Sequence, residues 1–274
     1  MVGAPEIRLL CIDLDGTLLG PDKLVSKGNR AAIERARAAG LHVAIASGRH
    51  PFNVCELLDE LGMTHDAVCL SGAYAILGGR EVHRHALADE AVACVVDIVE
   101  ASGCYVSLSG VNFNLTAGHL VRKGGETRAT SRYLRCASYD ELRAAACERP
   151  GLILKAAVHA ENPRVYENLR ARLCAIPGVE VAQSDVCWSD VCPAGCSKAE
   201  GIEALARALG LTMGQVAAVG DDENDVASLA AVGLGIAMGN ALPAAKEAAK
   251  LIVADNEHDG VAEAIDLILE RKFS

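Results

Sequence analysis

Short apolar runs alternate with stretches of helical periodicity in the first third of the chain. The pattern predicts strands at 7–13, 41–47 and 66–71 and helices at 26–40 and 51–62. Each apolar run is continuous, which is typical of strands that are buried on both faces of a sheet. Ser26 is suited to cap the first helix, Gly40 to follow its end, and Pro51 to begin the second helix. Strands separated by helices in this way indicate right-handed crossovers and a parallel sheet.

The last third of the chain repeats this alternation. It predicts helices at 197–210, 223–233, 243–250 and 259–272 and strands at 215–220, 234–239 and 251–254. We therefore expect the two outer parts of the chain to form one α/β domain with a doubly wound, Rossmann-like parallel sheet.

The middle of the chain has a different pattern. The expected elements are helices at 89–101, from Tyr139 onward and at 162–176, and strands at 104–109, 111–117, 152–159, 179–184 and 186–191. A polar connection rich in Gly, Lys and Arg follows residue 117, and Ser138 and Glu141 have the spacing of a capping box. Neighbouring strands with alternating polarity favour antiparallel pairs. The predicted organisation is a core domain at 1–83 and 191–274, with an α+β cap domain inserted at 84–190.

Composition narrows the possible partners. The chain has 274 residues, 51% of them hydrophobic, and a formal net charge of −10. Such an acidic chain does not favour a general nucleic-acid or membrane surface, although it can hold one pocket for an anionic ligand. No apolar stretch approaches the ~18 residues of a membrane span, and no signal-peptide pattern begins the sequence. The 11 cysteines have irregular spacing, so we expect reduced thiols and a cytoplasmic protein. The sequence leaves any oligomeric partner undefined.

Polar residues follow the predicted core strands at the points where the strands end. In a parallel sheet these ends meet at one edge, where ligands bind. Taken alone, an Asp after a strand caps a helix or forms a turn, and a Lys is usually exposed. The joint placement favours a common site. The residues are Asp13 and Asp15 after the first strand, Ser47 and Gly48 after the second, Asp221, Asn224 and Asp225 after the strand at 215–220, and Lys198 in the first turn of the helix at 197–210.

The carboxylates in this set need a positive partner. Two carboxylates about 4 Å apart repel by about 4 kcal/mol at an effective dielectric of 20, and Asp221 adds a third acid to Asp13 and Asp15. Oxygen ligands without His favour Mg²⁺ over zinc, and Mg²⁺ usually takes part of its ligand shell from a substrate phosphate. A hydroxyl, free backbone N–H groups and a lysine at a helix N-terminus form a site for that phosphate. The set indicates metal-dependent phosphoryl transfer.

Four segments carry a resemblance to a known family. The segment DLDGT, the Ser of ASGR, the Lys of GCSKAEGIEAL and the segment GDDEND follow the order of the four motifs of the haloacid dehalogenase-like hydrolases. The position of the inserted cap resembles the Cof-like phosphatase subgroup, and so do the C-terminal segments LGIAMGNALPAAKEAA and VADNEHDGVAEAI. The segment CLSGAY departs from this pattern, because many relatives have Asn where this chain has Ser71.

The resemblance implies how the first motif works. Asp13 is expected to be the nucleophile that forms an aspartyl-phosphate. Asp15 is expected to protonate the leaving alcohol and then to activate water, while Thr17 braces the loop. In the ion-pumping relatives a Thr stands at the position equivalent to Asp15. A carboxylate there favours turnover, so the resemblance implies a hydrolase.

The resemblance also implies the binding groups and their ligands. The phosphoryl oxygens would be bound by Ser47, Gly48, Lys198 and Asn224. Mg²⁺ would be bound by Asp13, Asp221 and the backbone carbonyl of Asp15, with Asp225 binding the ion or orienting its shell. The substrate is expected to be a small phosphorylated metabolite, such as a sugar phosphate, which the cap encloses. Two other functions could use the same residues: a sugar phosphomutase, and a phospho-aspartate switch that does not turn over.

Overall fold

Two compact units make up the chain in its computed structural model, which describes residues 6–120 and 133–270. The first unit runs to His83 and resumes at Ser197, and the second spans Arg84–Cys196. The polar connection expected after residue 117 falls largely on 121–132, outside the described residues. Among the described helices, none is long and apolar enough to cross a membrane.

An eight-stranded sheet forms the centre of the first unit, in the order β14-β13-β12-β1-β2-β3-β4-β5. The pairs from β14 to β3 are parallel, and β4 pairs antiparallel with β3. The strands are β1 (Leu9–Ile12), β2 (His42–Ala46), β3 (Ala67–Cys69), β4 (Tyr74–Leu77), β5 (Arg80–Arg84), β12 (Val216–Gly220), β13 (Leu234–Ala237) and β14 (Leu251–Ile252). Every residue of β1 and β12 is buried, as their continuous apolar runs predict.

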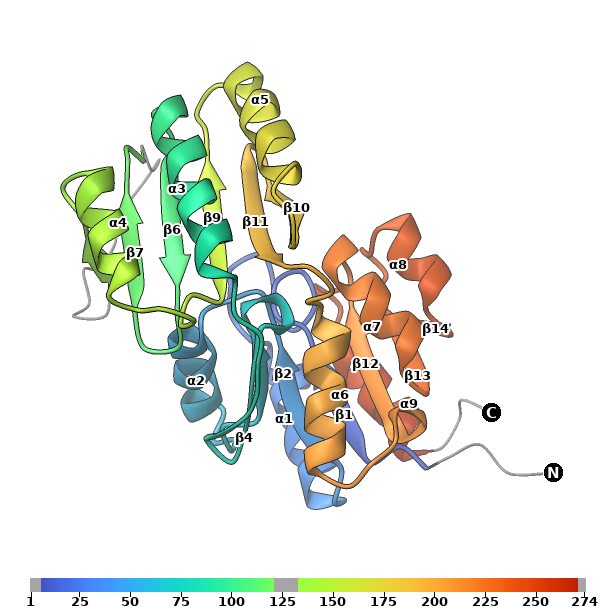
Figure 1. Cartoon of the computed structure of the whole chain (residues 1–274). Helices are drawn as coiled ribbons and strands as arrows, with labels where there is room; N and C mark the ends of the chain where they lie inside the picture. Colours follow the sequence, from blue (N-terminus) through green and yellow to red (C-terminus); the bar gives the residue numbers. More distant parts are fainter. Residues whose placement is uncertain (1–5, 121–132, 271–274) are drawn as a thin grey trace. The chain divides into compact units, whose positions relative to one another are not determined.

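Helices lie on both faces of this sheet (Figure 1). They are α1 (Lys27–Ala38), α2 (Pro51–Glu60), α6 (Lys198–Ala208), α7 (Val226–Ala231), α8 (Pro243–Ala248) and α9 (Gly260–Leu269). Helix α1 packs beside α9, while α7 packs between α6 and α8. The predicted helix starts are confirmed: the Ser26 hydroxyl accepts a hydrogen bond from the Asn29 N–H, and Pro51 is the first residue of α2. The doubly wound α/β core is therefore confirmed.

Two local elements differ from the prediction. The strand expected at 66–71 ends at Cys69, because Leu70 and Ser71 take left-handed φ values of 52° and 60°. This turn leads into β4 and β5, which the apolar pattern did not predict. The helix expected at 223–233 divides into a 3₁₀ turn, η3 (Glu223–Asp225), and α7. Both departures occur at strand ends. The Leu70 and Ser71 N–H groups donate to the carbonyls of Arg49 and Ser47. At η3, the side chains of Asp222 and Asp225 accept backbone hydrogen bonds.

The second unit is a six-stranded sheet in the order β10-β11-β9-β6-β7-β8. Its strands are β6 (Tyr105–Ser109), β7 (Asn114–Ala117), β8 (Tyr133–Arg135), β9 (Lys155–His159), β10 (Val179–Asp185) and β11 (Trp188–Pro193). Its helices are α3 (Asp89–Ser102), α4 (Tyr139–Cys147) and α5 (Pro163–Cys174). Helix α3 packs against α4 and α5, and the three helices lie on one face of the sheet (Figure 1). Most strand pairs are antiparallel, which confirms the expected α+β character; β7 and β8 are parallel.

Candidate active site

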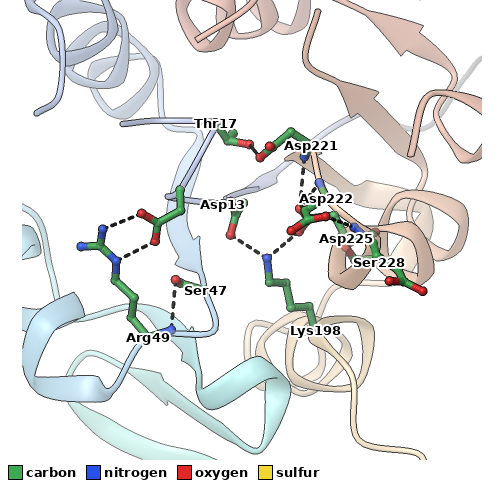
Figure 2. Close-up of polar contacts among 11 residues, drawn as sticks. Asp13, Thr17, Ser47, Arg49, Lys198, Asp221, Asp222, Asp225 and Ser228 are labelled. Atoms are coloured by element: carbon green, nitrogen blue, oxygen red, sulfur yellow. Dashed lines mark hydrogen bonds and ion pairs between the residues drawn. The ribbon is translucent and has the colours of Figure 1, made fainter. Parts of the chain in front are cut away.

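Lys198 lies at the centre of a buried charged group in the first unit. It is the first residue of α6, where the Ser197 hydroxyl caps the helix by accepting a hydrogen bond from the Glu200 N–H. Its side chain is only 1% exposed, and its Nζ lies 2.6 Å from Asp13 Oδ1 and 2.7 Å from Asp225 Oδ1. Figure 2 shows the ammonium group between the two carboxylates. Residues from the beginning and the end of the chain thus meet at one cation.

Asp225 is held on both of its carboxylate oxygens. While Oδ1 accepts from Lys198, Oδ2 accepts hydrogen bonds from the backbone N–H groups of Asp221 (3.1 Å) and Asp222 (3.2 Å). The Ser228 hydroxyl donates to the backbone carbonyl of Asp225 at 2.8 Å. This pattern closes the turn after β12 and orients the residue that follows the strand. Asp225 is thereby placed to support Asp221 as well as to contribute its own charge.

Asp221 is positioned by the loop that follows Asp13. The Thr17 hydroxyl donates to Asp221 Oδ1 at 2.6 Å (Figure 2). Gly16 has a φ of +84°, and a Cβ at this position would lie 2.2 Å from Asp221 Oδ2. Only glycine permits both the backbone conformation and the close approach of the carboxylate. The GT pair of the DLDGT segment is therefore explained by its contact with the last motif.

The three carboxylates exceed the charge that one lysine can neutralise. Oxygen atoms of Asp13, Asp221 and Asp225 lie within 4.8 Å of one another. Burial, with the charges of neighbouring acids, raises the pKa of Asp13 to about 7 even though Lys198 opposes this, and likewise raises the pKa of Asp221 to about 6. Burial works to lower the pKa of Lys198, but the two carboxylates in contact with it outweigh burial and raise that pKa. A buried group with this excess of negative charge fits a divalent cation.

Asp15 lies in a different electrostatic environment. Its two oxygens accept hydrogen bonds from Arg49 Nε and Nη2, both at 2.8 Å, and Lys23 Nζ donates to Oδ1 at 2.9 Å. Burial works to raise the pKa of Asp15, but these hydrogen bonds and charges outweigh it and lower that pKa to about 2. Asp15 is thus held as a carboxylate by two cations. The pKa values of Asp13 and Asp15 are therefore shifted in opposite directions without any ligand.

The predicted phosphate-binding residues differ in how fully the fold positions them. Ser47 is buried at the end of β2, and its hydroxyl oxygen accepts a hydrogen bond from the Arg49 N–H at 3.2 Å. That bond leaves the hydroxyl hydrogen available to donate, and Gly48 lies between the two residues. The Ser71 N–H donates to the Ser47 carbonyl at 3.3 Å, so the left-handed turn supports this loop. Asn224 is exposed in η3.

Sequence reasoning assigned no role to the side chains of Arg49, Lys23 or Ser228. The signal for Arg49 was present, because it directly follows Ser47 and Gly48 at the end of a predicted strand. Lys23 gave no such signal, since it lies in a polar turn far from any strand end. Its position beside Asp15 depends on how residues 16–25 fold back, and Leu19 forms bridges to both Asp15 and Val25.

Comparison with known proteins gives consistent matches along the whole chain. A family model for haloacid dehalogenase-like hydrolases matches residues 10–265. The putative phosphatase YkrA of Bacillus subtilis (strain 168) is 28% identical over 264 residues, which cover 95% of this chain and 97% of that protein. The 5-amino-6-(5-phospho-D-ribitylamino)uracil phosphatase YcsE of the same organism is 29% identical over 269 residues, and the match covers 95% of each chain.

Solved structures agree with these sequence matches. A haloacid dehalogenase-like hydrolase from Bacteroides thetaiotaomicron superposes with a TM-score of 0.81 and 25% identity, covering 96% of this chain and all of that one. Because the match includes both units, the similarity is not confined to the core sheet.

Proposed function

This chain belongs to the haloacid dehalogenase-like hydrolases and is a phosphoric monoester hydrolase, and on that premise we propose that it is a Mg²⁺-dependent phosphatase that acts through an aspartyl-phosphate on Asp13. The observation that carries the proposal is the unbalanced group around Lys198, in which three carboxylates from two motifs meet one cation. A nucleophile, a countercharge and a set of hard oxygen ligands occupy one edge of the sheet.

The residues that would hold Mg²⁺ fit that ion. Asp13 and Asp221 would provide carboxylate oxygens, the backbone carbonyl of Asp15 would complete the protein ligands, and Asp225 would bind the ion or orient its shell. The raised pKa values of Asp13 and Asp221 support this assignment, because they arise from buried like charges that a divalent cation would neutralise. When bound, Mg²⁺ would offset the charge of the phosphate and of the attacking carboxylate.

The phosphoryl group would be bound by donors that surround Asp13. Lys198 Nζ contacts the nucleophile directly, so it can bridge Asp13 and a phosphoryl oxygen during the reaction. The Ser47 hydroxyl hydrogen and the Gly48 N–H would bind a second oxygen, and Asn224 would reach the phosphate from η3. These donors would stabilise the negative charge of the transferring group while Asp13 Oδ attacks phosphorus.

Asp15 would move the protons of the two half-reactions. As the bond from phosphorus to the leaving oxygen breaks, Asp15 gives its proton to that oxygen; it then takes a proton from the water that attacks the aspartyl-phosphate. Hydrolysis releases phosphate and restores the Asp13 carboxylate. Since Arg49 and Lys23 hold Asp15 ionised in this conformation, the acid step requires Asp15 to leave these cations.

The substrate is proposed to be a small phosphorylated metabolite. Relatives with curated names act on small phosphate esters: one on a phosphorylated ribitylaminouracil and another, the YbhA protein of Escherichia coli (strain K12), on pyridoxal phosphate. Residues 84–190 would select the substrate as the cap. Assaying a panel of sugar phosphates and phosphorylated cofactors would identify the leaving group that the cap selects.

Phosphate release from p-nitrophenyl phosphate, with Mg²⁺ and with a chelator, tests the proposal. We expect activity only with Mg²⁺, and a loss of about 10⁴-fold or more in Asp13→Asn. Asp22→Asn makes the same chemical change at an exposed turn and should retain activity. An active Asp13→Asn protein would remove the nucleophile assignment. Assaying a sugar phosphate for isomerised product separates a phosphatase from a phosphomutase.

A further inference from the structure

The turn that connects Asp13 and Asp15 to Thr17 is held from outside by two asparagines. Asn240 lies after β13, and Asn256 lies between β14 and α9. They belong to the two C-terminal segments that the proposed chemistry does not use. Both asparagines direct their side chains at the backbone of residues 16–19, more than two hundred positions earlier in the sequence.

The contacts form a continuous brace. Asn240 Nδ2 donates to the Gly16 carbonyl at 2.8 Å, and Asn240 Oδ1 accepts a hydrogen bond from the Asn256 N–H at 3.1 Å. Asn256 Nδ2 donates to the Leu19 carbonyl at 2.9 Å. The two side-chain amides therefore hold both ends of the turn, and the Asn256 backbone also holds the Asn240 side chain. An amide is suited to this position because it supplies a donor and an acceptor in one plane.

The brace continues to the metal-binding group through one peptide. The Gly16 carbonyl bonded to Asn240 belongs to the same peptide unit as the Thr17 N–H, which donates to the Leu14 carbonyl at 3.3 Å. Because a peptide is planar, fixing the Gly16 carbonyl also fixes the direction of the Thr17 N–H and the position of the Thr17 Cα. The Thr17 hydroxyl then donates to Asp221 Oδ1 at 2.6 Å. Orientation is thus transmitted from Asn240 to the Asp221 carboxylate.

The same C-terminal segment also supports Asp221 from its backbone. The Leu242 N–H donates to the Asp221 carbonyl at 2.8 Å, and the Met238 N–H donates to the Gly220 carbonyl at 3.1 Å. Residues 238–242 therefore contact both the loop of the first motif and the end of β12. This segment holds the two aspartate-bearing loops at a fixed separation.

We infer that Asn240, with Asn256 supporting it, is a positioning residue that sets the metal affinity of the site by fixing the Gly16–Thr17 peptide and, through Thr17, the Asp221 carboxylate. The inference rests on the proposed role of Asp221 as a metal ligand. Hydrogen-bonded partners of ligands typically contribute 10–100-fold in metal affinity. The side-chain hydrogen bonds of Asn240 go to Gly16 and Asn256 and not to the carboxylates.

Thermal unfolding of the metal-free full chain at increasing Mg²⁺ concentrations tests the inference. Ligand binding raises the melting temperature by an amount that depends on the dissociation constant, so affinity is measured without an activity assay. We expect Asn240→Ala to weaken Mg²⁺ binding about tenfold. Asn53→Ala, the same change at an exposed position of α2, should leave the dissociation constant unchanged.

A double-mutant cycle with Thr17→Val separates positioning from general destabilisation. If Asn240 acts through Thr17, the double variant should bind Mg²⁺ about as weakly as Thr17→Val alone, because both changes cut one path. Effects that multiply independently would overturn the inference. So would an Asn240→Ala protein that melts at a lower temperature but keeps its Mg²⁺ affinity within twofold. Should Asn240→Ala not fold, Asn256→Ala, which removes the donor to the Leu19 carbonyl and adds no charge, takes its place.

The response of the unchanged chain to Mg²⁺ shows whether a negative result contradicts the proposed function or only the role of Asn240. A chain whose melting temperature does not respond to Mg²⁺ contradicts the Mg²⁺-dependent function itself and the inference with it. A chain that responds to Mg²⁺, with an Asn240→Ala variant that responds equally, contradicts the inference alone.

Discussion

Each of the two units pairs a lysine with aspartate, and the two groups differ in their balance of charge. In the first unit Lys198 contacts Asp13 and Asp225, and Asp221 lies beside them. In the second unit Lys155 of β9 forms an ion pair with Asp190 of the neighbouring strand β11, and Asp190 also accepts a hydrogen bond from Ser184 at 3.3 Å. Among the described residues, three carboxylates lie around one ammonium group in the first case, and the ion pair in the second joins one ammonium group to one carboxylate.

The difference indicates which group is built for a ligand. A balanced pair carries no excess charge, so it needs no further ligand, even though burying the two ions is costly. An unbalanced group remains costly until a cation or protons arrive, and the raised pKa values of Asp13 and Asp221 express that cost. Excess charge, more than burial or the presence of a lysine, therefore separates the candidate active site from a structural ion pair.

Among the variants that distinguish the two lysine groups, replacing Lys198 should produce the largest effect. Lys198→Met removes the only lysine in contact with both Asp13 and Asp225 among the described residues, so the nucleophile loses its countercharge and the phosphoryl group loses a donor. Turnover of p-nitrophenyl phosphate should fall about a thousandfold. Lys27→Met is a close control, because Lys27 is also the first residue of a helix that a serine caps, and it is exposed. Equal losses in the two variants would contradict the assignment.

Breaking the Lys155–Asp190 pair should lower the stability of the protein but have little effect on turnover. Lys155→Met leaves Asp190 without its cation and should lower the free energy of unfolding by about 3 kcal/mol, measured by urea denaturation. Turnover per folded molecule should stay within threefold. The double variant Lys155→Met/Asp190→Leu should recover most of the stability, since an apolar pair carries no unpaired charge. A tenfold loss of turnover in folded Lys155→Met would give the pair a role in substrate binding and contradict its assignment as a structural ion pair.

Asp66 shows how a buried carboxylate is compensated by neighbouring hydrogen-bond donors and one imidazole. Asp66 directly precedes β3 and is buried. It accepts hydrogen bonds from the Thr64 hydroxyl and from the Gly78 N–H (2.5 Å) in the turn between β4 and β5, and His42 Nε2 lies 3.0 Å away. Burial works to raise the pKa of Asp66, but the contacts with His42, Thr64 and Gly78 outweigh it and lower that pKa from 3.8 to about 2. This shift is opposite in direction to the shift at Asp221.

Asp66→Asn should therefore destabilise the protein by about 2 kcal/mol at neutral pH. Because the folded pKa lies below the unfolded value, the stabilisation by Asp66 is complete above about pH 4 and is lost as the pH falls toward 2. Chemical denaturation of both proteins between pH 7 and pH 3 should show the difference shrinking with acid. A difference that stays constant over this range would mean that the charge of Asp66 contributes nothing.

The core of the fold was predictable because its signals are local. Continuous apolar runs identify β1 and β12 as buried strands, and Ser26 and Pro51 identify the starts of α1 and α2. The left-handed turn at Leu70 and Ser71 could not be predicted, because neither residue is a glycine and the conformation is imposed by contacts with the loop after β2. The β4–β5 region was missed for the same reason.

The candidate site was predictable as a set but not in its internal contacts. Joint placement at strand ends grouped Asp13, Lys198, Asp221 and Asp225, and the family resemblance that these motifs suggested is confirmed. Spacing alone cannot show that Asp15 turns toward Arg49, because that depends on side-chain direction. Nor can it show that Asn240 contacts Gly16 across 224 positions. The assigned roles in catalysis and the cytoplasmic location stay predictions.

The smallest expected effect is the change in stability on replacing Asp221, and its sign should reverse when Mg²⁺ is added. The pKa of Asp221 is raised to about 6 by burial and by the neighbouring acids, so its charge is penalised in the folded state. The penalty grows as the pH rises from about 4 to 6 and is complete above that. Without metal at pH 8, Asp221→Asn should therefore be about 1 kcal/mol more stable than the unchanged chain, a value reduced for the partial exposure of this residue.

With excess Mg²⁺ the order should invert, because the unchanged chain gains the free energy of binding and the variant loses a ligand. Melting temperatures at pH 5 and pH 8, with Mg²⁺ and with a chelator, measure both signs in one experiment. Asp22→Asn, at an exposed turn, should follow the unchanged chain under all four conditions. An Asp221→Asn protein that is less stable without metal would show that the Lys198 group is already balanced, as the Lys155 pair is. The excess of charge would then not mark a ligand site.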